Sequence, residues 1–249
     1  MKLTIVGCSG SMPGPSSPAS CYLVESDGFR LLLDLGHGSL GALQNYIGVD
    51  EIDAIALSHL HADHCMDLTA LYVARVYGDY DITSRLPVYG PSSTADRMAD
   101  AYGLPRATGM HSTFDFQDLA LVTTIGPFQF RSTRVAHPVE AHAIRLEADG
   151  LSLTYSADTG PCPDLVTLAD GTDLLLCEAS LPEVGEHPIN LHLTGGQAGE
   201  VATKASAKQL LLTHVPPWND PGEALHAAQS TFAGPAALAT SGMVVTVGR

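Results

Sequence analysis

The amino-acid sequence predicts an α/β protein in which at least one β-sheet is covered by helices. The early part of the chain is rich in short apolar and β-branched segments that are bounded by turn residues. The later part alternates such segments with segments of helical periodicity. Of the 249 residues, 45% are hydrophobic and only 16% are charged. This composition is that of a folded protein with a sizeable core.

The predicted strands follow from short apolar runs that end in Gly, Pro, Asp or Ser. In chain order they are Leu3–Val6, Cys21–Val24, Arg30–Leu33, Ile55–Leu57, Phe128–Val135, Ala143–Glu147, Leu151–Tyr155, Leu174–Cys177, Leu210–Thr213 and Met243–Val247. The predicted helices are His64–Val76, Thr94–Tyr102, Asp164–Ala169, Gly195–Lys204 and Glu223–Phe232. Polar and titratable residues gather in the turns "GCSGSMPGPSSP", "DLGHGS", "SADTGPCP" and "HVPPWNDPG". Because loops at strand ends commonly carry function, these turns are the first candidates for a site.

The N-terminus "MKLTIVGCSG" passes from a single lysine into a short apolar run. This run is too short for the apolar core of a signal peptide and indicates a first strand. No apolar stretch approaches the 18 or more residues that span a bilayer. The five cysteines are odd in number and form no C-x-x-C pair, which favours reduced thiols over a disulfide framework. We therefore expect a cytoplasmic protein without a membrane partner.

The formal net charge is −15, from 27 acidic and 12 basic residues. Such a surface repels a long polyphosphate backbone, so no extended nucleic acid is expected as a partner. A small anionic substrate remains compatible with this charge, because a local metal site can reverse the sign at the point of contact.

The segment "SHLHADH" carries the densest group of candidate metal ligands. His59 and His61 are two residues apart after an apolar strand, so they point to the same side of an extended chain. Asp63 and His64 follow at the expected start of a helix, where Asp63 would serve as N-cap and Met66, Ala70, Val73 and Tyr77 would form the buried stripe. Imidazoles and a carboxylate at this spacing indicate a site for zinc, iron or manganese rather than a polar loop.

Three later residues each follow a predicted strand. They are His137 after "FRSTRVA", Asp158 after "LSLTYSA" and His214 after "QLLLT". Each alone has an ordinary interpretation: a loop residue before a proline, a turn former and a surface histidine. Their shared placement makes all three candidates for the same metal centre.

Taken in order, "SHLHADH", His137, "SADTG" and "LLLTHVPPW" resemble the metallo-β-lactamase fold superfamily over nearly the whole chain. The resemblance implies one domain, residues 1–249, folded as a four-layer αββα sandwich of two mixed β-sheets. It implies two divalent metal ions at one edge, with zinc preferred and manganese or iron as alternatives. His59, His61 and His137 would hold one ion, Asp63, His64 and His214 the other, and Asp158 would bridge them. The two ions would share a hydroxide that attacks the substrate.

Within the superfamily, the chain is most similar to the branch of ribonuclease Z and related phosphodiesterases. "SADTG" resembles that branch's S-G-D-T with Ala157 in place of glycine, and "INLHLTGGQAGEVATKASAKQLLLTH" resembles its histidine-plus-helix segment. The resemblance makes His192 and Asp63 candidate catalytic residues. His192 would stabilise charge or donate a proton at the leaving oxygen, and Glu178 in "LLCEAS" would orient it. The alternative for His192 is a loop residue at a helix entry.

One departure bears on the substrate. Ribonuclease Z enzymes carry a long arm that grips tRNA between the third metal histidine and the bridging aspartate, whereas only twenty residues separate His137 from Asp158. This segment reads as a hairpin with a turn at "ADG". The chain looks especially like compact bacterial cyclic-nucleotide phosphodiesterases, which implies hydrolysis of a cyclic nucleotide to the 5′-nucleotide. The alternatives are tRNA 3′-processing, lactone or thioester hydrolysis, and a metal-binding protein without turnover.

The sequence does not decide the roles of three aromatic residues, the oligomeric state or the role of Asp67. Phe114, Tyr72 and Trp218 are candidates to stack on a base, or are core and rim aromatics. A homodimer is compatible with the apolar helix faces. Asp67, where the wider family commonly has glycine, would either complement a helix dipole or hydrogen-bond the outer nitrogen of a ligand histidine, and we favour the second slightly.

Overall fold

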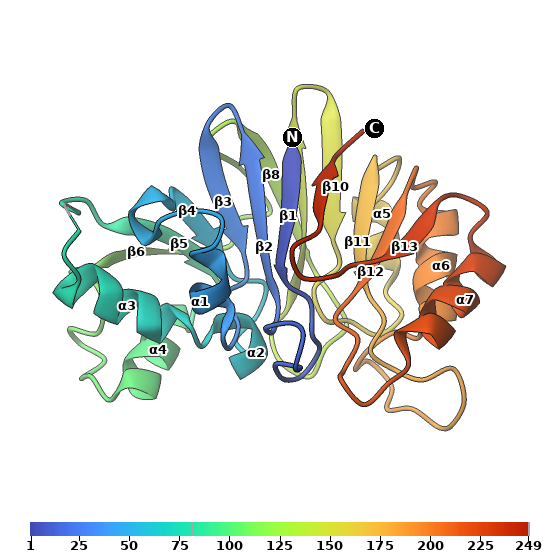
Figure 1. Ribbon diagram of the computed structural model, residues 1–249, viewed down its shortest axis with the longest axis horizontal. Helices are drawn as coiled ribbons and strands as arrows, with labels where there is room; N and C mark the ends of the chain where they lie inside the picture. Colours follow the sequence, from blue (N-terminus) through green and yellow to red (C-terminus); the bar gives the residue numbers. More distant parts are fainter. Residues whose placement is uncertain (81, 249) are drawn as a thin grey trace.

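The computed structural model describes residues 1–80 and 82–248. In these residues two mixed seven-stranded sheets face each other and helices cover both outer faces (Figure 1). The first sheet contains, in spatial order, β14 (Val244–Thr246), β1 (Lys2–Gly7), β2 (Cys21–Ser26), β3 (Phe29–Leu33), β4 (Ala54–Ala56), β5 (Leu86–Gly90) and β6 (Phe114–Asp118). The second contains β13 (Ala236–Leu238), β12 (Leu210–Thr213), β11 (Leu174–Glu178), β10 (Leu151–Tyr155), β9 (His142–Ala148), β8 (Phe128–Arg134) and β7 (Val122–Ile125). The expected αββα sandwich of two mixed sheets is confirmed.

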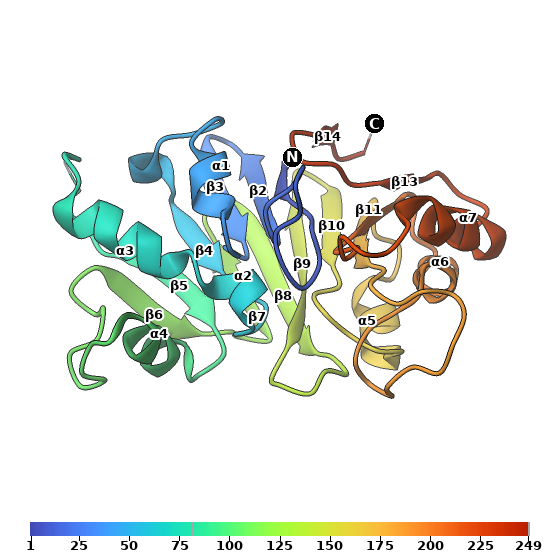
Figure 2. The ribbon, with the colours of Figure 1, turned by 60° about the horizontal axis from the view of Figure 1, so that its bottom comes forward.

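Helices of the early chain lie outside the first sheet, and those of the later chain lie outside the second (Figures 1 and 2). The first group is α1 (Ser39–Leu43), the 3₁₀ turn η1 (Val49–Glu51), α2 (Ala62–Cys65), α3 (Leu68–Tyr77) and α4 (Thr94–Tyr102). The second group is α5 (Pro163–Leu168), α6 (Gly195–Lys204) and α7 (Pro221–Thr231). Among the described residues, none of the helices is both long enough and apolar enough to cross a membrane.

Three hydrophobic clusters separate the four layers. The inner cluster fills the space between the sheets, and each outer cluster joins one sheet to its helices. Side chains of a strand alternate between faces, so Leu31 and Leu33 enter the inner cluster while Leu32 enters an outer one. Both faces of these strands are buried, which explains why the central strands are continuous apolar runs.

The strands that the sequence did not predict are β5, β6, β7 and β13. Two of them, β7 and β13, are short and lie at or near a sheet edge, where they bury little apolar surface. In β5, Pro87 interrupts the apolar pattern, and β6 alternates aromatic with acidic or amide residues. Edge strands lack the continuous apolar signal because one side meets solvent.

The helix predicted from His64 to Val76 is two helices. The backbone of Leu35 divides them: its N–H donates to the carbonyl of His64, and its carbonyl accepts from the N–H of Asp67. His61, not Asp63, is the N-cap residue of α2. The predicted buried stripe is therefore wrong. Tyr77 is 72% exposed, whereas Cys65, Leu68 and Leu71 are buried.

Strands β9 and β10 form the predicted simple hairpin. Strand β9 pairs antiparallel with β10, and Leu151 stands opposite Ala148. Asp149 and Gly150 form the turn with φ values of 55° and 74°. Two successive positive φ values are typical of the tight hairpin turn in which Asp-Gly is favoured.

Candidate metal centre and active site

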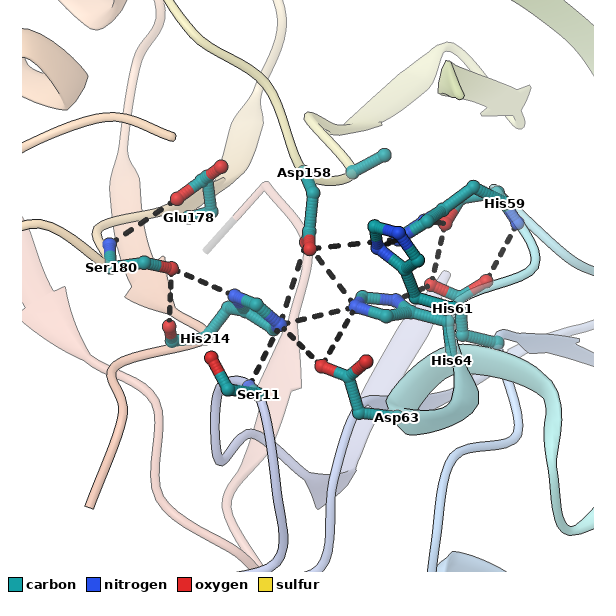
Figure 3. Close-up of polar contacts among 12 residues, drawn as sticks. Ser11, His59, His61, Asp63, His64, Asp158, Glu178, Ser180 and His214 are labelled. Carbon is teal, nitrogen blue, oxygen red and sulfur yellow. Dashed lines mark hydrogen bonds and ion pairs between the residues drawn. The ribbon is translucent and has the colours of Figure 1, made fainter. Parts of the chain in front are cut away.

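The candidate ligands meet because several strands of both sheets end at one edge of the sandwich. In the second sheet β10, β11 and β12 run parallel, and β8 shares their direction because β9 is antiparallel to both β8 and β10. The loops after β8, β10 and β12 carry His137, Asp158 and His214. The loop after β4 of the first sheet and the helix α2 that follows it carry the remaining histidines, and Figure 3 shows side chains from both sheets converging.

Two of the turns that present these side chains have unusual backbone conformations. Ala157 and His214 have φ values of 55° and 57°, and Asp34 at the end of β3 has a φ of 60°. Residues other than glycine seldom adopt this left-handed region, and such strain collects at functional sites. The positive φ of Ala157 also explains why the resembling branch has glycine at this place.

A first cluster joins His59, His61, His137 and Asp158. Nδ1 of His61 lies 3.2 Å from Nε2 of His59 and 3.1 Å from Nε2 of His137. Oδ2 of Asp158 lies 3.6 Å from Nε2 of His59. Ligands about 2.0–2.1 Å from a tetrahedral ion stand roughly 3.4 Å from one another, so these separations match the edges of a coordination tetrahedron.

A second cluster joins Asp63, His64, Asp158 and His214. Nε2 of His64 and Nε2 of His214 are 3.1 Å apart, and Oδ2 of Asp63 is 3.1 Å from Nε2 of His214. Oδ1 of Asp158 lies 3.3 Å from His64 and 3.5 Å from His214. Asp158 thus directs one oxygen to each cluster, which is the arrangement of a bridging carboxylate.

The protonation of the rings shows that these contacts are not ordinary hydrogen bonds. Nδ1 of His137 bonds the carbonyl of Leu191 at 2.8 Å, and Nδ1 of His64 bonds the carboxylate of Asp34 at 2.8 Å. The Ser180 hydroxyl donates to the carbonyl of His214, so it accepts from Nδ1 of that ring. Each Nδ1 therefore carries the proton, and in the neutral ring each Nε2 presents only a lone pair to the cluster.

A carboxylate oxygen of Asp158 also indicates that a cation binds between the clusters. Asp158 is only 2% exposed, and its buried Oδ1 has no hydrogen-bond partner among the described residues. An unpaired buried carboxylate oxygen among lone pairs is costly unless a positive charge lies between them. The donor set of imidazoles and carboxylates suits a divalent metal ion, and the residues present fit one.

The pKa directions agree with this arrangement. Burial lowers the pKa values of His59, His61 and His137, so these rings are in the neutral form that binds metal. Burial also opposes protonation of His64, but the charges of Asp158 and Asp34 outweigh it and raise its pKa. A proton and a metal ion thus compete for the same place beside His64.

Asp34 is a residue of this site that the sequence did not single out. It is fully buried and accepts hydrogen bonds from the Ser58 N–H at 2.6 Å and the Tyr155 hydroxyl at 2.8 Å, in addition to His64. The Ser58 hydroxyl donates to Asp34 and so accepts from Nδ1 of His59. Asp34 begins "DLGHGS", one of the polar turns that the sequence analysis marked as candidates for a site. Nothing in the sequence showed which histidine its carboxylate would contact.

The favoured interpretation of Asp67 is wrong. Its Oδ2 accepts from the Leu40 N–H at 2.9 Å, in the first turn of α1, and does not contact a ligand histidine among the described contacts. Asp67 therefore stabilises the N-terminal end of a helix, as the first interpretation stated, but that helix is α1 rather than its own. Asp34 occupies the role that Asp67 was expected to have.

A buried pair lies beside the second cluster. Oε1 of Glu178 is 2.8 Å from Nδ1 of His192 and also accepts from the Thr159 N–H at 2.7 Å. Glu178 is fully buried, and His192 comes from the loop before α6. Burial lowers the pKa of His192, but the hydrogen bond and charge of Glu178 outweigh burial and raise it. The charge of Glu178 therefore favours the protonated form of the ring.

The three aromatic candidates do not share one place. Phe114 is fully buried, and the ring of Tyr72 packs against Tyr102 at 5.1 Å. Both belong to the core between the first sheet and its helices. Trp218 is 65% exposed and lines a small pocket beside α7. Phe114 and Tyr72 are thus packing residues.

Comparison with known proteins agrees with the fold and the clusters. Residues 30–215 match the family described as the beta-lactamase superfamily domain. Protein ML1173 of Mycobacterium leprae is 40% identical over 249 residues, covering 97% of this chain and 87% of the relative. The probable metallo-hydrolase YhfI of Bacillus subtilis is 30% identical over 246 residues, covering 98% and 99%.

Solved structures give the same result. The crystal structure of YhfI superimposes with a TM-score of 0.88 at 28% identity, covering 98% of each chain. Human short-form tRNase Z superimposes with a TM-score of 0.78 at 20% identity over the whole of both chains, which shows a shared fold. The chain belongs to the beta-lactamase superfamily and is a metal-dependent hydrolase.

Proposed function

We propose that the protein is a phosphodiesterase that hydrolyses a small phosphodiester, a 3′,5′-cyclic nucleotide, to the 5′-nucleotide. The observation that carries this proposal is the short connection from His137 to Asp158. It consists of the β9–β10 hairpin with its two-residue turn and leaves no room for an RNA-gripping arm. The net charge of −15 supports a small substrate over an extended polyanion.

The proposed centre holds two divalent ions, with zinc preferred and manganese or iron as alternatives. His59, His61 and His137 would hold one, Asp63, His64 and His214 the other, and Asp158 would bridge them. When bound, two such ions activate water near neutral pH and neutralise charge on the phosphate oxygens. This local positive charge also explains how an acidic protein can take an anionic substrate.

His192 and Glu178 supply the remaining chemistry in this proposal. Nδ1 of His192 is occupied by Glu178 at 2.8 Å, so its Nε2 is the atom that can reach a substrate. There it would donate a proton to the leaving 3′ oxygen and so avoid release of a free alkoxide. Glu178, buried and held by the N–H groups of Thr159 and Ser180, would orient the ring.

Two other hydrolytic functions remain as alternatives to be tested. Human tRNase Z shares the fold, but the absent arm and the acidic surface weigh against RNA processing here. Lactone or thioester hydrolysis would use the same metal centre. The His192 segment weighs against both because it resembles that of the ribonuclease Z and phosphodiesterase branch, and a thioester in addition releases a thiolate, which leaves without a proton donor.

An assay panel on the metal-loaded protein tests the proposal. We expect turnover of cyclic AMP or cyclic GMP and of bis-p-nitrophenyl phosphate, its loss with chelator and its recovery on adding metal. A lactone, a thioester and a precursor tRNA are the comparison substrates. Turnover of the lactone or the tRNA without turnover of any phosphodiester of nucleotide size would overturn the proposal.

A further inference from the structure

The loop from Pro182 to His192 is closed at its base. Leu181 and Thr194 form an isolated parallel bridge, and the Leu181 N–H donates to the carbonyl of Leu193 at 2.9 Å. A side-chain oxygen of Glu183 accepts from the Gly196 N–H at 3.0 Å, which ties the start of the loop to α6. Compact loops with adjoining ends frequently carry function.

The far part of the same loop is held against the metal centre. The carbonyl of Leu191 is the partner of Nδ1 of the candidate ligand His137 at 2.8 Å. Gly160, two residues after Asp158, packs on the loop backbone, and a Cβ atom there would lie only 2.7 Å from Cα of Asn190. The loop is therefore fixed in position relative to both clusters.

A pocket of about 240 Å³ is formed by the far part of this loop together with Pro161, Leu181 and Gln197, and His192 borders it. It is lined by Pro161, Leu181, His187, Pro188, Ile189, Asn190, His192 and Gln197. His192 thus belongs to the pocket as well as to the group formed with Glu178 and His214. A substrate with its phosphate at the metal clusters would extend past His192 into this pocket.

One of the residues that line the pocket, His187, has a side-chain nitrogen that lacks a hydrogen-bond partner among the described residues. This atom is Nε2, and it is buried. Four of the eight lining residues are proline or aliphatic, the other four are histidine, asparagine or glutamine, and Ile189 at the rim is 89% exposed. A buried unpaired polar atom is costly, and apolar walls with a few convergent polar groups are typical of a small-molecule subsite.

We propose that this pocket binds the nucleoside part of the substrate and that His187 is a specificity-determining residue whose Nε2 hydrogen-bonds the polar edge of the base. The identity of the ligand rests on the function proposed above. The sugar bears the oxygen that leaves, so its place beside His192 puts the base next to it in the pocket. The proline and aliphatic side chains suit a flat ring, and the unpartnered nitrogen suits the edge of that ring.

Substitution of His187 tests this inference. For His187→Ala we expect roughly a tenfold fall in kcat/KM for cyclic AMP, carried mainly by KM, because one hydrogen bond to substrate is lost. Hydrolysis of bis-p-nitrophenyl phosphate, which has no base, should change by less than about twofold. His187→Gln should recover part of the cyclic AMP activity. His226→Ala, which removes an exposed histidine of α7, is the matched control and should leave both activities unchanged.

A second measurement separates this inference from the proposed function. Adenosine 5′-monophosphate and inorganic phosphate are tested as inhibitors of bis-p-nitrophenyl phosphate hydrolysis. His187→Ala should weaken inhibition by the nucleotide about tenfold and leave inhibition by phosphate unchanged. If the native chain turns over cyclic AMP and the variant matches it in every assay, the pocket assignment is wrong and the function stands. If cyclic AMP is not a substrate but nucleotide inhibition weakens selectively, the pocket assignment stands and the function is wrong. An equal loss with both substrates, or a loss of metal, would also overturn the assignment.

Discussion

At the scale of single residues, the metal centre depends on where each imidazole carries its proton. His64, His137 and His214 each place the Nδ1 proton on an acceptor supplied by another part of the chain. This fixes both the tautomer and the ring orientation, so that Nε2 faces the cluster. Asp34 orients more than one of the rings. It bonds His64 directly, and it accepts from the Ser58 hydroxyl, which in turn bonds Nδ1 of His59.

The role of Asp34 is tested by a pair of variants. Asp34→Asn keeps the shape but replaces a charged acceptor that serves His64, Tyr155 and Ser58, so metal affinity should fall by roughly 10–100-fold. Asp67→Asn, at the acid that contacts α1 instead, should leave metal affinity unchanged. Competition with a chromophoric chelator measures both. Equal affinity losses in the two variants would contradict the assignment.

The role of His192 is tested by separating turnover from metal content. His192→Ala should lower kcat by roughly 10²–10⁴ because the proton donor at the leaving oxygen is removed. Metal content, measured by plasma emission spectrometry, should stay near that of the native chain. Glu178→Gln should also lower kcat, since the ring loses its charged partner. The side chains of Glu178, His192 and His214 lie close enough to hold an ion, so loss of metal in His192→Ala would identify His192 as a ligand instead.

At the scale of elements, the packing of α6 on α7 depends on a glycine. A Cβ atom at Gly199 would lie 2.1 Å from Oγ1 of Thr231 and 2.5 Å from the carbonyl oxygen of Ala228. The two helices therefore approach more closely than any side chain at this position allows. Thr194 is the N-cap residue of α6, and its hydroxyl accepts from the Gln197 N–H.

Two glycine variants test this packing. Gly199→Ala should lower the free energy of unfolding by about 1–3 kcal/mol because the helices must separate. Gly41→Ala, in α1, meets no atom within 4 Å and should raise it by up to about 1 kcal/mol through helix propensity. Urea denaturation of the metal-loaded proteins gives both values. A Gly199→Ala variant as stable as the native chain would show that the helices can move apart freely.

At the scale of the whole molecule, the metal centre joins the two halves of the sandwich. The candidate ligands His59, His61, Asp63 and His64 follow β4 of the first sheet, whereas His137, Asp158 and His214 follow strands of the second. An ion held by both groups is lost on unfolding. Its binding free energy therefore adds to the stability of the fold.

Removal of metal should accordingly lower Tm. An ion present at a thousandfold excess over its Kd contributes about 4 kcal/mol, which corresponds to roughly 10 °C for a chain of this size. Calorimetry with and without chelator measures the shift, and adding metal back should restore it. His61→Ala, which removes a ligand of one cluster, should show a smaller chelator effect. An unchanged Tm after verified metal removal would mean that the ions do not hold the sheets together.

Elements whose signal is local in the sequence were predicted with the right bounds, whereas elements that depend on distant contacts were not. Central strands such as β10 and β12, and the helices α4 and α6, agree with their predicted bounds because continuous apolar runs and clear helical periodicity arise locally. The edge strands β6, β7 and β13 were missed because little of their surface is buried. The break between α2 and α3 was missed because its cause is the backbone of Leu35, 29 residues before His64 in the chain.

The fold class and the list of candidate ligands could be predicted without the structure. Strand ends, metal-binding residue types and their order are properties of neighbouring residues, and the seven candidates do form two clusters. Three features depend on the folded arrangement: which oxygen of Asp158 faces which cluster, the contact of His64 with Asp34 rather than Asp67, and the place of His187 in a pocket with His192. These are contacts between loops far apart in the chain. Their geometry is set by how the two sheets pack, and no local pattern records it.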